Sequence, residues 1–190
     1  MEKITAILNA ARDLFAQKGF DQTPVSEIAK KAGVAGGTII YHFKNKENLL
    51  FILIRQILYS LYRQTQDEMN PVTDGMDAVN CYIRAFFQFL GTRTNDIMVL
   101  LKTNPFEVIN LEAHPNADVR LIFDRYLDLL VEAIKRGQAD GSIQAGQPVD
   151  MARFIFATLF GSGQLVVCFK YDSEQLMRSA LHFARAGLKP

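Results

Sequence analysis

Apolar residues recur at intervals of three and four along almost the whole chain, which is the spacing of one face of an α-helix. The first such stripe comprises Ile4, Ile7, Leu8, Ala11, Leu14 and Phe15. The alternation of apolar and polar residues that marks a half-buried strand appears nowhere at useful length. The sequence therefore predicts an all-α protein of about nine helices.

Turn-forming and capping residues divide the first part of this pattern. Gly19 and Gly33 are expected to end the first two helices, and Thr23 is expected to cap the second. Asn45 can cap a long helix over residues 45–69, which Pro71 follows.

The second part of the chain carries further helical stripes. They predict helices that begin near residues 76, 97, 119, 151 and 173, with Gly137 ending one of them and Ser173 capping the last. Residues 104–117 contain two prolines and are expected to form a loop with one helical turn.

Composition limits the class of protein. A chain of 190 residues is long enough for one or two domains with a packed core. Its net charge of +1 does not by itself indicate a nucleic-acid partner. No apolar run approaches the roughly 20 residues that span a bilayer. The N-terminus is amphipathic and does not resemble a signal peptide. We therefore expect a cytoplasmic protein without a membrane partner.

Reactive residues are few and scattered. Cys81 and Cys168 lie in no metal-binding or redox spacing and are interpreted as small buried hydrophobic residues. The three histidines, at positions 42, 114 and 182, have no second ligand at a useful spacing, so neither a metal nor a cofactor is expected. Catalytic motifs such as GxSxG, HExxH and the Walker sequence are missing, which disfavours an enzyme.

The stretch GVAGGTIIYHFKNKENLL, residues 33–50, carries the main functional signal. Two short helices separated by a turn at Gly33 have the layout of a helix-turn-helix, whose second helix enters the major groove of DNA. Gly36 and Gly37 would let the backbone approach DNA closely. Thr38, Tyr41 and His42 are expected on the exposed side, opposite the inward-facing Ile39 and Phe43.

Residues 4–50 resemble the DNA-binding domain of the tetracycline-repressor (TetR) family of bacterial transcription regulators. The resemblance rests on the Gly-Thr, Tyr-His-Phe and Lys-Glu-x-Leu groupings within ILNAARDLFAQKGFDQTPVSEIAKKAGVAGGTIIYHFKNKENLL. It implies that Gly37, Thr38, Tyr41 and His42 face DNA, with Gly36 beside them, and that Thr23 and Lys46 hold flanking phosphates. Ala35 and Gly36 depart from the family, which often has a Ser or Thr cap and then a polar residue there.

Simpler interpretations of the same residues remain open at this stage. Tyr41 and His42 could form a half-buried aromatic pair, and Lys46 could be a solvated charge at a helix start. The bare segment Ala35-Gly36-Gly37 also allows a module that has lost DNA binding.

The resemblance implies a DNA-binding domain over residues 1–46 and a helical ligand-binding and dimerisation domain over residues 47–190. Candidate walls of an apolar ligand site are Phe86, Phe87, Phe123, Tyr126, Phe156 and Phe160. Core packing is the alternative explanation for these aromatic residues. Candidate polar groups that could orient a ligand are Asn80, Arg84, Tyr126 and Gln164, each of which could also be a surface residue.

The segment Gly161-Ser162-Gly163 interrupts an otherwise strong helical pattern. It is interpreted either as a bend or as a close approach of helices across a dimer interface, and the resemblance favours the interface. The predicted interface residues are Gly161, Gly163, Leu165 and Leu181.

These observations predict a ligand-responsive transcriptional regulator that binds a palindromic operator as a homodimer. Release of double-stranded operator DNA by a small, largely apolar effector is the expected mode of control. A ligand-binding or interaction module without operator binding is the alternative, and a small enzyme is a weaker one. The sequence does not distinguish repression from activation.

Overall fold

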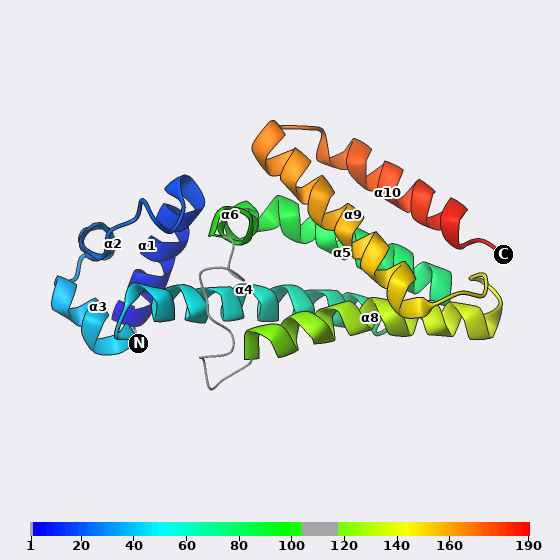
Figure 1. Ribbon diagram of the computed structural model, residues 1–190, viewed down its shortest axis with the longest axis horizontal. Helices are drawn as coiled ribbons and strands as arrows, with labels where there is room; N and C mark the ends of the chain where they lie inside the picture. Colours follow the sequence, from blue (N-terminus) through cyan, green and yellow to red (C-terminus); the bar gives the residue numbers. More distant parts are fainter. Residues whose placement is uncertain (1, 104–117) are drawn as a thin grey trace. The chain divides into compact units, whose positions relative to one another are not determined.

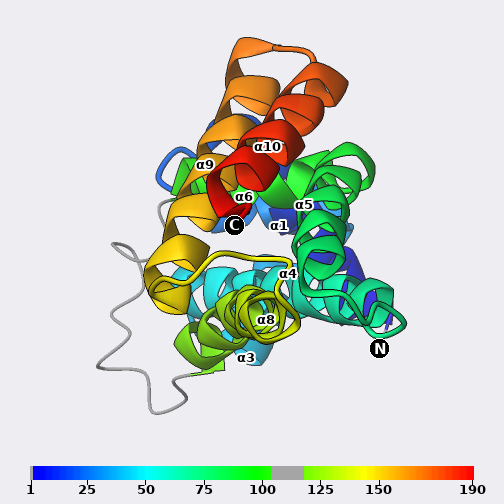
Figure 2. The same ribbon diagram turned by 90° about the vertical axis from the view of Figure 1, so that its right-hand side faces the viewer.

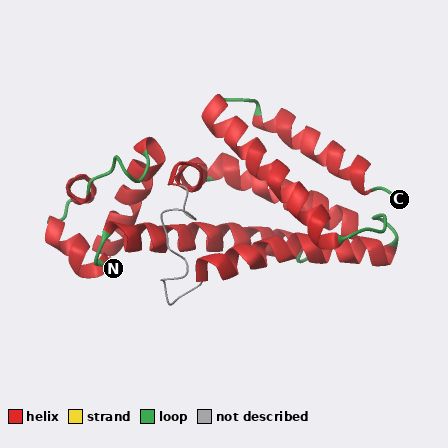
Figure 3. Ribbon diagram, viewed as in Figure 1, coloured by secondary structure: helices red, strands yellow, loops and turns green. Residues whose placement is uncertain are grey.

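Every regular element in the described part of the chain is an α-helix. The computed structural model describes residues 2–103 and 118–190 (Figures 1 and 3). The helices are α1 (Glu2–Lys18), α2 (Val25–Ala32), α3 (Gly36–Phe43), α4 (Lys46–Met69), α5 (Gly75–Thr92), α6 (Thr94–Thr103), α8 (Asp118–Asp140), α9 (Pro148–Phe169) and α10 (Ser173–Leu188). The predicted all-α class is confirmed. The loop predicted over residues 104–117, with His114, lies outside the described residues.

Contacts between Cα atoms divide the described residues into two compact units. The first unit lies within Met1–Ile57 and Arg93–Arg120, and the second within Leu58–Thr92 and Leu121–Pro190. The first unit therefore holds α1, α2, α3 and α6, whereas α4 contributes residues to both units. The functional division at residues 46 and 47 remains a prediction.

Helix α1 is the centre of the first unit. It packs against both α2 and α6, and Ile7, Ala11 and Phe15 are fully buried along it. Ion pairs join α1 to α2 at the rim of this core, from Lys18 to Glu27 and from Lys31 to Asp13. Apolar burial therefore holds the unit together, and the pairs at its rim are exposed enough to contribute little.

Three of the predicted helix ends are confirmed. Gly19 and Gly33 have φ of 83° and 66°, in the left-handed region that glycine adopts without a steric penalty. The side chain of Asn45 accepts a hydrogen bond of 2.7 Å from the backbone N–H of Asn48, which caps α4 as expected.

The expected cap at Thr23 is wrong. Thr23 is fully buried, and its hydroxyl donates a hydrogen bond of 2.7 Å to the carbonyl of Gly19. Pro24 is the residue that precedes α2, and it provides no side-chain cap. The Thr23 hydroxyl is therefore used in a contact with the preceding loop, which the local sequence pattern did not reveal.

The N-cap of the last helix lies one residue earlier than predicted. Asp172, not Ser173, is its N-cap, and the Asp172 side chain accepts a hydrogen bond of 2.6 Å from the N–H of Gln175. Aspartate and serine cap with similar strength, so adjacent candidates are not separated by residue type alone.

Gly137 does not end α8, contrary to the prediction. The helix continues to Asp140, and Gly141, with φ of 80°, follows it. A Cβ atom added to Gly75, at the start of α5, would lie 2.0 Å from the backbone nitrogen of Gly137. Two glycines therefore meet where α5 crosses α8, and Gly137 serves this close approach.

In the second unit, α10 packs on α5 and α9, and α9 packs on α5. Figures 1 and 2 both show α9 and α10 side by side. The Nε of Arg185 on α10 donates a hydrogen bond of 3.2 Å to Oδ1 of the buried Asn80 on α5.

Helix α9 is continuous across Gly161-Ser162-Gly163. The Ser162 hydroxyl donates a hydrogen bond of 2.8 Å to the carbonyl of Thr158, one turn earlier in the helix. A Cβ atom on Gly163 would lie 3.2 Å from Cζ of Phe86, so this glycine accommodates α5 of the same chain. Among the described helices α9 alone is long and apolar enough to span a membrane, a property that core helices of soluble proteins share.

Replacing Gly75 with alanine should destabilise the protein by about 1–3 kcal/mol, because the new methyl group would overlap backbone atoms of Gly137. Urea unfolding at neutral pH measures this loss. Gly91→Ala on the same helix is the matched control, because its Cβ would meet nothing within 4 Å. Equal effects of the two substitutions would contradict the close approach of α5 and α8.

Candidate nucleic-acid interface and ligand site

A short turn joins α2 to α3. The left-handed conformation of Gly33 ends α2, and the N–H of Val34 donates a hydrogen bond of 3.0 Å to the carbonyl of Ala29. This bond closes the end of α2 and redirects the chain into α3. The arrangement is that of a helix-turn-helix, with α3 as the second helix.

The two faces of α3 differ sharply. Ile39 and Phe43 are buried in the core of the first unit. Tyr41 is 84% exposed, and His42 is exposed beside it, with the two rings edge to face at 5.0 Å. Of the other predicted contacts Thr38 is half-buried. Ile40, which the sequence analysis did not single out, is 50% exposed on this helix.

The start of α3 is bare. A Cβ atom added to Gly36 or Gly37 would meet nothing within 4 Å, so packing inside this chain does not require either glycine. Ala35 precedes them in extended conformation and offers no side-chain cap. The first N–H groups of a helix lack partners within the helix, and here no side chain at the cap position covers them. The opening of α3 can therefore receive a close-fitting anionic or base surface.

Lys46 and Thr23 were both predicted to hold phosphates, and the structure places them differently. The Nζ of Lys46 donates a hydrogen bond of 2.9 Å to the carbonyl of Phe20 and lies 4.1 Å from the centre of that ring. These contacts hold the ammonium group at the start of α4 and leave two of its N–H donors for a further partner. Thr23 is fully buried, so its hydroxyl is not presented at the surface.

The turn from α3 to α4 is strained. Lys44 has φ of 66° and ψ of −52°, values that a residue with a side chain rarely adopts. The N–H of Asn45 donates a hydrogen bond of 2.8 Å to the carbonyl of Phe43, which makes Lys44 the centre of a γ-turn. Such a conformation persists only where the surrounding structure holds it.

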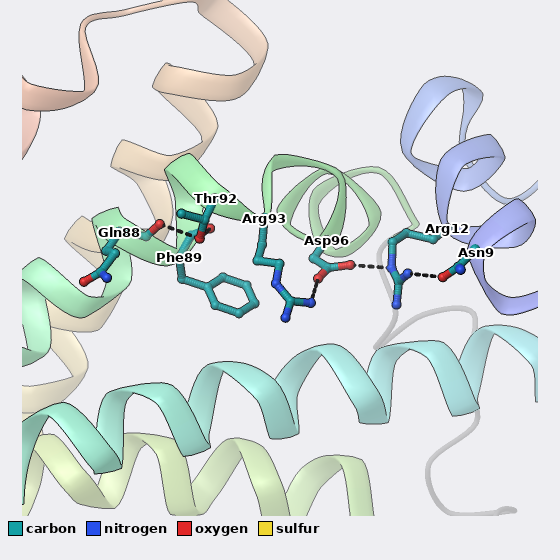
Figure 4. A network of polar contacts seen from close by, with 7 residues as sticks. All are labelled: Asn9, Arg12, Gln88, Phe89, Thr92, Arg93 and Asp96. Atoms are coloured by element: carbon teal, nitrogen blue, oxygen red, sulfur yellow. Dashed lines mark hydrogen bonds and ion pairs between the residues drawn. The ribbon is translucent and has the colours of Figure 1, made fainter. Parts of the chain in front are cut away.

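A charged network connects α1 to α6 inside the first unit (Figure 4). Asp96 is 3% exposed, and its Oδ1 lies 2.6 Å from Nε of Arg12. Its other oxygen lies 3.5 Å from Arg93, and Arg12 also donates a hydrogen bond of 2.7 Å to Asn9. The buried carboxylate therefore has two guanidinium partners, as a charge out of water requires.

An aromatic cluster lies in the second unit. Tyr82 stacks on Tyr126 with ring centres 4.8 Å apart, and Phe156 meets Tyr126 at 6.2 Å. Phe156 also contacts Phe123 and Phe160, at 5.2 and 6.2 Å. The structure thus brings together four of the six predicted wall residues, from α8 and α9. Phe86 and Phe87 contact each other on α5.

Three buried hydroxyl groups in this unit have no hydrogen-bond partner of good geometry among the described residues. They belong to Thr65, Tyr82 and Tyr126, all of which are essentially fully buried. Burial raises the pKa of both tyrosines, and the Tyr82 and Thr65 hydroxyls are near enough to act on the pKa of Tyr126. An unpaired buried hydroxyl costs about 1–3 kcal/mol, so a polar atom brought among them would be held firmly. No group of three metal-ligating side chains occurs among the described residues.

Comparison with known proteins gives matches to one family of regulators. Residues 7–52 match the family described as bacterial regulatory proteins, tetR family. Over its length the chain is 29% identical to the fatty acid metabolism regulator protein of Bacillus subtilis (strain 168), with 98% of this chain and 95% of that protein covered. These matches confirm the resemblance to TetR-family regulators that the sequence indicated.

Other TetR-family relatives cover most of the chain. The transcriptional repressor KstR2 of Mycolicibacterium smegmatis is 27% identical over 158 residues, which are 82% of this chain and 75% of that protein. The crystal structure of FadR from Bacillus subtilis in complex with stearoyl-CoA has a TM-score of 0.81 and 27% identity, covering 97% of this chain and 98% of that one. FadR from Bacillus halodurans has the same TM-score and identity, with 96% and 94% covered.

The similarity to these regulators supports the predicted class of function. The matching proteins include a regulator of fatty acid metabolism and a transcriptional repressor, which supports a ligand-responsive transcriptional regulator. The proteins that it resembles are regulators and not enzymes. The family does not assign the individual contact residues, which remain predictions.

The C-terminal helices carry an exposed apolar face. Phe154 and Phe183 are 75% and 72% exposed, and Phe169 is 65% exposed. Phe154 and Phe183 line a groove of about 400 Å³ between α9 and α10, with Ile83 of α5 on its wall. The predicted ligand-site aromatic residues are not in its lining. Of the predicted interface residues, Gly161, Leu165 and Leu181 are half-buried.

Replacing Gly37 with alanine should separate stability from DNA binding. The free energy of unfolding should rise by up to about 1 kcal/mol, because alanine favours a helix and the added methyl group meets open space. Affinity for the DNA upstream of the gene should fall at least about tenfold, because that methyl group would occupy the approach surface.

Calorimetry and fluorescence anisotropy measure the two effects of Gly37→Ala. Gly91→Ala, in equally open surroundings on α5, should leave DNA affinity unchanged. If Gly37→Ala bound DNA as tightly as the unmodified protein, the start of α3 would not be an approach surface.

Proposed function

We propose that this protein is a homodimeric repressor whose operator binding is released by a long-chain fatty acyl-CoA. The proposal takes its effector class from the relatives, since the matching FadR of Bacillus subtilis was crystallised with stearoyl-CoA. The relative that matches 98% of this chain is a regulator of fatty acid metabolism.

The aromatic cluster of the second unit is the observation that carries the effector proposal. Its rings offer the apolar walls that an acyl chain would bury, and Tyr82, Tyr126 and Thr65 offer buried hydroxyls whose mutual geometry is poor for hydrogen bonding. A thioester carbonyl accepts hydrogen bonds and would satisfy donors of this kind. A site with apolar walls and a few convergent polar groups is the usual form of a small-molecule pocket.

On the DNA side, α3 would lie in the major groove. The bare N-terminus of α3 would face the duplex, Tyr41 and His42 would project beside it, and Lys46 would neutralise a phosphate. The side chain of Thr23 would act from the interior, by fixing the loop after α1 through Gly19. Operator binding belongs in this proposal to residues 1–46, and effector binding and dimerisation to residues 47–190.

A second copy of this chain would cover the exposed face of α9 and α10. Three phenylalanines exposed by 65–75% are costly in water, and a helix as apolar as α9 is explained by burial in a dimer without any membrane. A dimer also presents two copies of α3 to a palindromic operator, which one eight-residue helix could not read alone. The protein would work in the cytoplasm, where its operator is.

Control requires that the effector bind the DNA-free conformation more tightly than the DNA-bound one. The continuous helix α4 contributes residues to both units, beginning at Lys46 and containing Thr65. A change in the environment of Thr65 therefore acts on the same helix that begins beside the recognition helix.

Stearoyl-CoA should raise the melting temperature and release the protein from its operator, because it binds the folded, DNA-free state. Free stearate and CoA alone are the comparison ligands, and each should act more weakly because it supplies only part of the molecule. Tyr126→Phe should weaken stearoyl-CoA binding by about threefold to tenfold, the effect of one net hydrogen bond. Calorimetric titration measures the affinities.

Tyr171→Phe is the matched control, because Tyr171 is 59% exposed in the same unit. It should leave stearoyl-CoA affinity unchanged. If stearoyl-CoA neither binds nor releases DNA, the effector class is wrong. A loss of stability in Tyr126→Phe without any loss of affinity would mean that the hydroxyl has a structural role only.

Phe183→Asp should convert the protein to a monomer at micromolar concentration, because a charge in an apolar interface is costly to bury. Operator affinity should fall with it, since only one recognition helix would then bind. Sedimentation velocity measures the oligomeric state, and Tyr59→Asp, which changes an aromatic residue 54% exposed on α4, is the control. A Phe183→Asp variant that remains a dimer would exclude this face.

A further inference from the structure

Ile40 is the exposed apolar side chain on the recognition helix. It is 50% exposed, whereas Ile39 beside it is fully buried and Phe43 is 4% exposed. The core of the first unit therefore does not need Ile40. A half-exposed isoleucine contributes little to the stability of an eight-residue helix, because β-branched residues have lower helix propensity than leucine or alanine.

The position of Ile40 places it beside the bare start of α3. Residues three and four apart share a face of a helix, so Gly36, Gly37 and Ile40 line up along one side. The two glycines have open space around them and are exposed. Ile40 is thus the first side chain on this face, and the missing side chains before it let the helix come close to whatever it contacts.

Several polar side chains around this face can bind the DNA backbone. Tyr41 has a hydroxyl, and Lys44 and Lys46 have ammonium groups, all of which are ordinary phosphate partners that carry no sequence information. Ile40 has no donor or acceptor and cannot contribute in that way. In the major groove the one apolar group on a base edge is the 5-methyl group of thymine.

We propose that Ile40 contacts the 5-methyl group of a thymine in each half of the operator and selects for thymine at that position. This rests on the proposed operator binding and extends it to the base that is read. Removing water from two apolar groups favours the contact, and cytosine or a purine at that position would present a polar edge to the isoleucine.

Replacing single thymines by deoxyuridine tests the contact, because deoxyuridine differs from thymidine only by the missing methyl group. The probe is the tightest duplex that the full-length dimer selects from randomised DNA. One thymine per half-site should be sensitive, with a loss of about fourfold in affinity for each methyl removed, the value of one buried methyl group. Fluorescence anisotropy at fixed salt measures the affinities.

The Ile40→Ala variant completes the comparison. It should bind the thymine duplex more weakly than the unmodified protein, and it should no longer distinguish thymine from uracil at the sensitive position. Leu121→Ala, which shortens an aliphatic side chain 48% exposed on α8, should retain the full discrimination. Melting temperatures of both variants should match the unmodified protein within a few degrees.

Two results would overturn the inference while leaving operator binding intact. One is an operator in which every thymine can be replaced by deoxyuridine without loss. The other is an Ile40→Ala variant that still discriminates thymine from uracil as strongly as the unmodified protein. If no duplex is selected at all, the proposed operator binding fails, and the assignment of Ile40 fails with it.

Discussion

The recognition helix depends on the burial of two side chains. An isolated helix of eight residues is far below the length that is stable in water. Ile39 and Phe43 supply the missing stability by entering the core that α1 organises. Since two residues on one side suffice to hold the helix, the remaining positions are free to carry glycines, an exposed tyrosine and an exposed isoleucine. The division of labour within α3 follows from its small size.

Helix α6 also packs against α1 and completes the core around it. The salt bridge from Arg12 to the buried Asp96, with Arg93 beside it, joins two helices that are about 80 residues apart in the chain. Removing one partner of such a pair leaves a buried charge without compensation, so substituting Arg12 alone would destabilise this contact between α1 and α6. The arrangement links the helix that packs the DNA-binding core to a part of the chain far from residues 4–50.

The features that the sequence predicted are those with local causes. Left-handed glycines at Gly19 and Gly33 and the cap at Asn45 depend on neighbours within a few residues, and the structure confirms them. Gly137 and Gly163 depend on Gly75 and Phe86, which lie far away in the chain, so their roles could not be read from spacing. Gly137 was assigned to a helix end, whereas it serves helix packing, and Gly163 also accommodates Phe86 of the same chain.

The same distinction applies to the candidate sites. The sequence indicated the exposed side of α3 through its periodicity, yet it passed over Ile40 because an isoleucine is normally assigned to the core. The burial of Thr23 depends on how the loop between α1 and α2 folds. The arrangement of the hydroxyls around Tyr126 depends on contacts among several helices. Residue type at a position was therefore a good guide to the helix-turn-helix and a poor one to the polar groups of the second unit.

The strained turn at Lys44 has a mechanical consequence. A flexible connection between two helices absorbs a small rotation of one of them, whereas a turn fixed on both sides passes the rotation on. Here the N–H of Lys44 donates a hydrogen bond of 2.9 Å to the carbonyl of Ile40, and the N–H of Asn45 donates one of 2.8 Å to the carbonyl of Phe43. These bonds restrict movement between α3 and the first turn of α4. The joint is therefore a stiff coupling in which a tilt at the beginning of α4 would carry α3 with it, and the two hydrogen bonds hold Lys44 in its strained conformation.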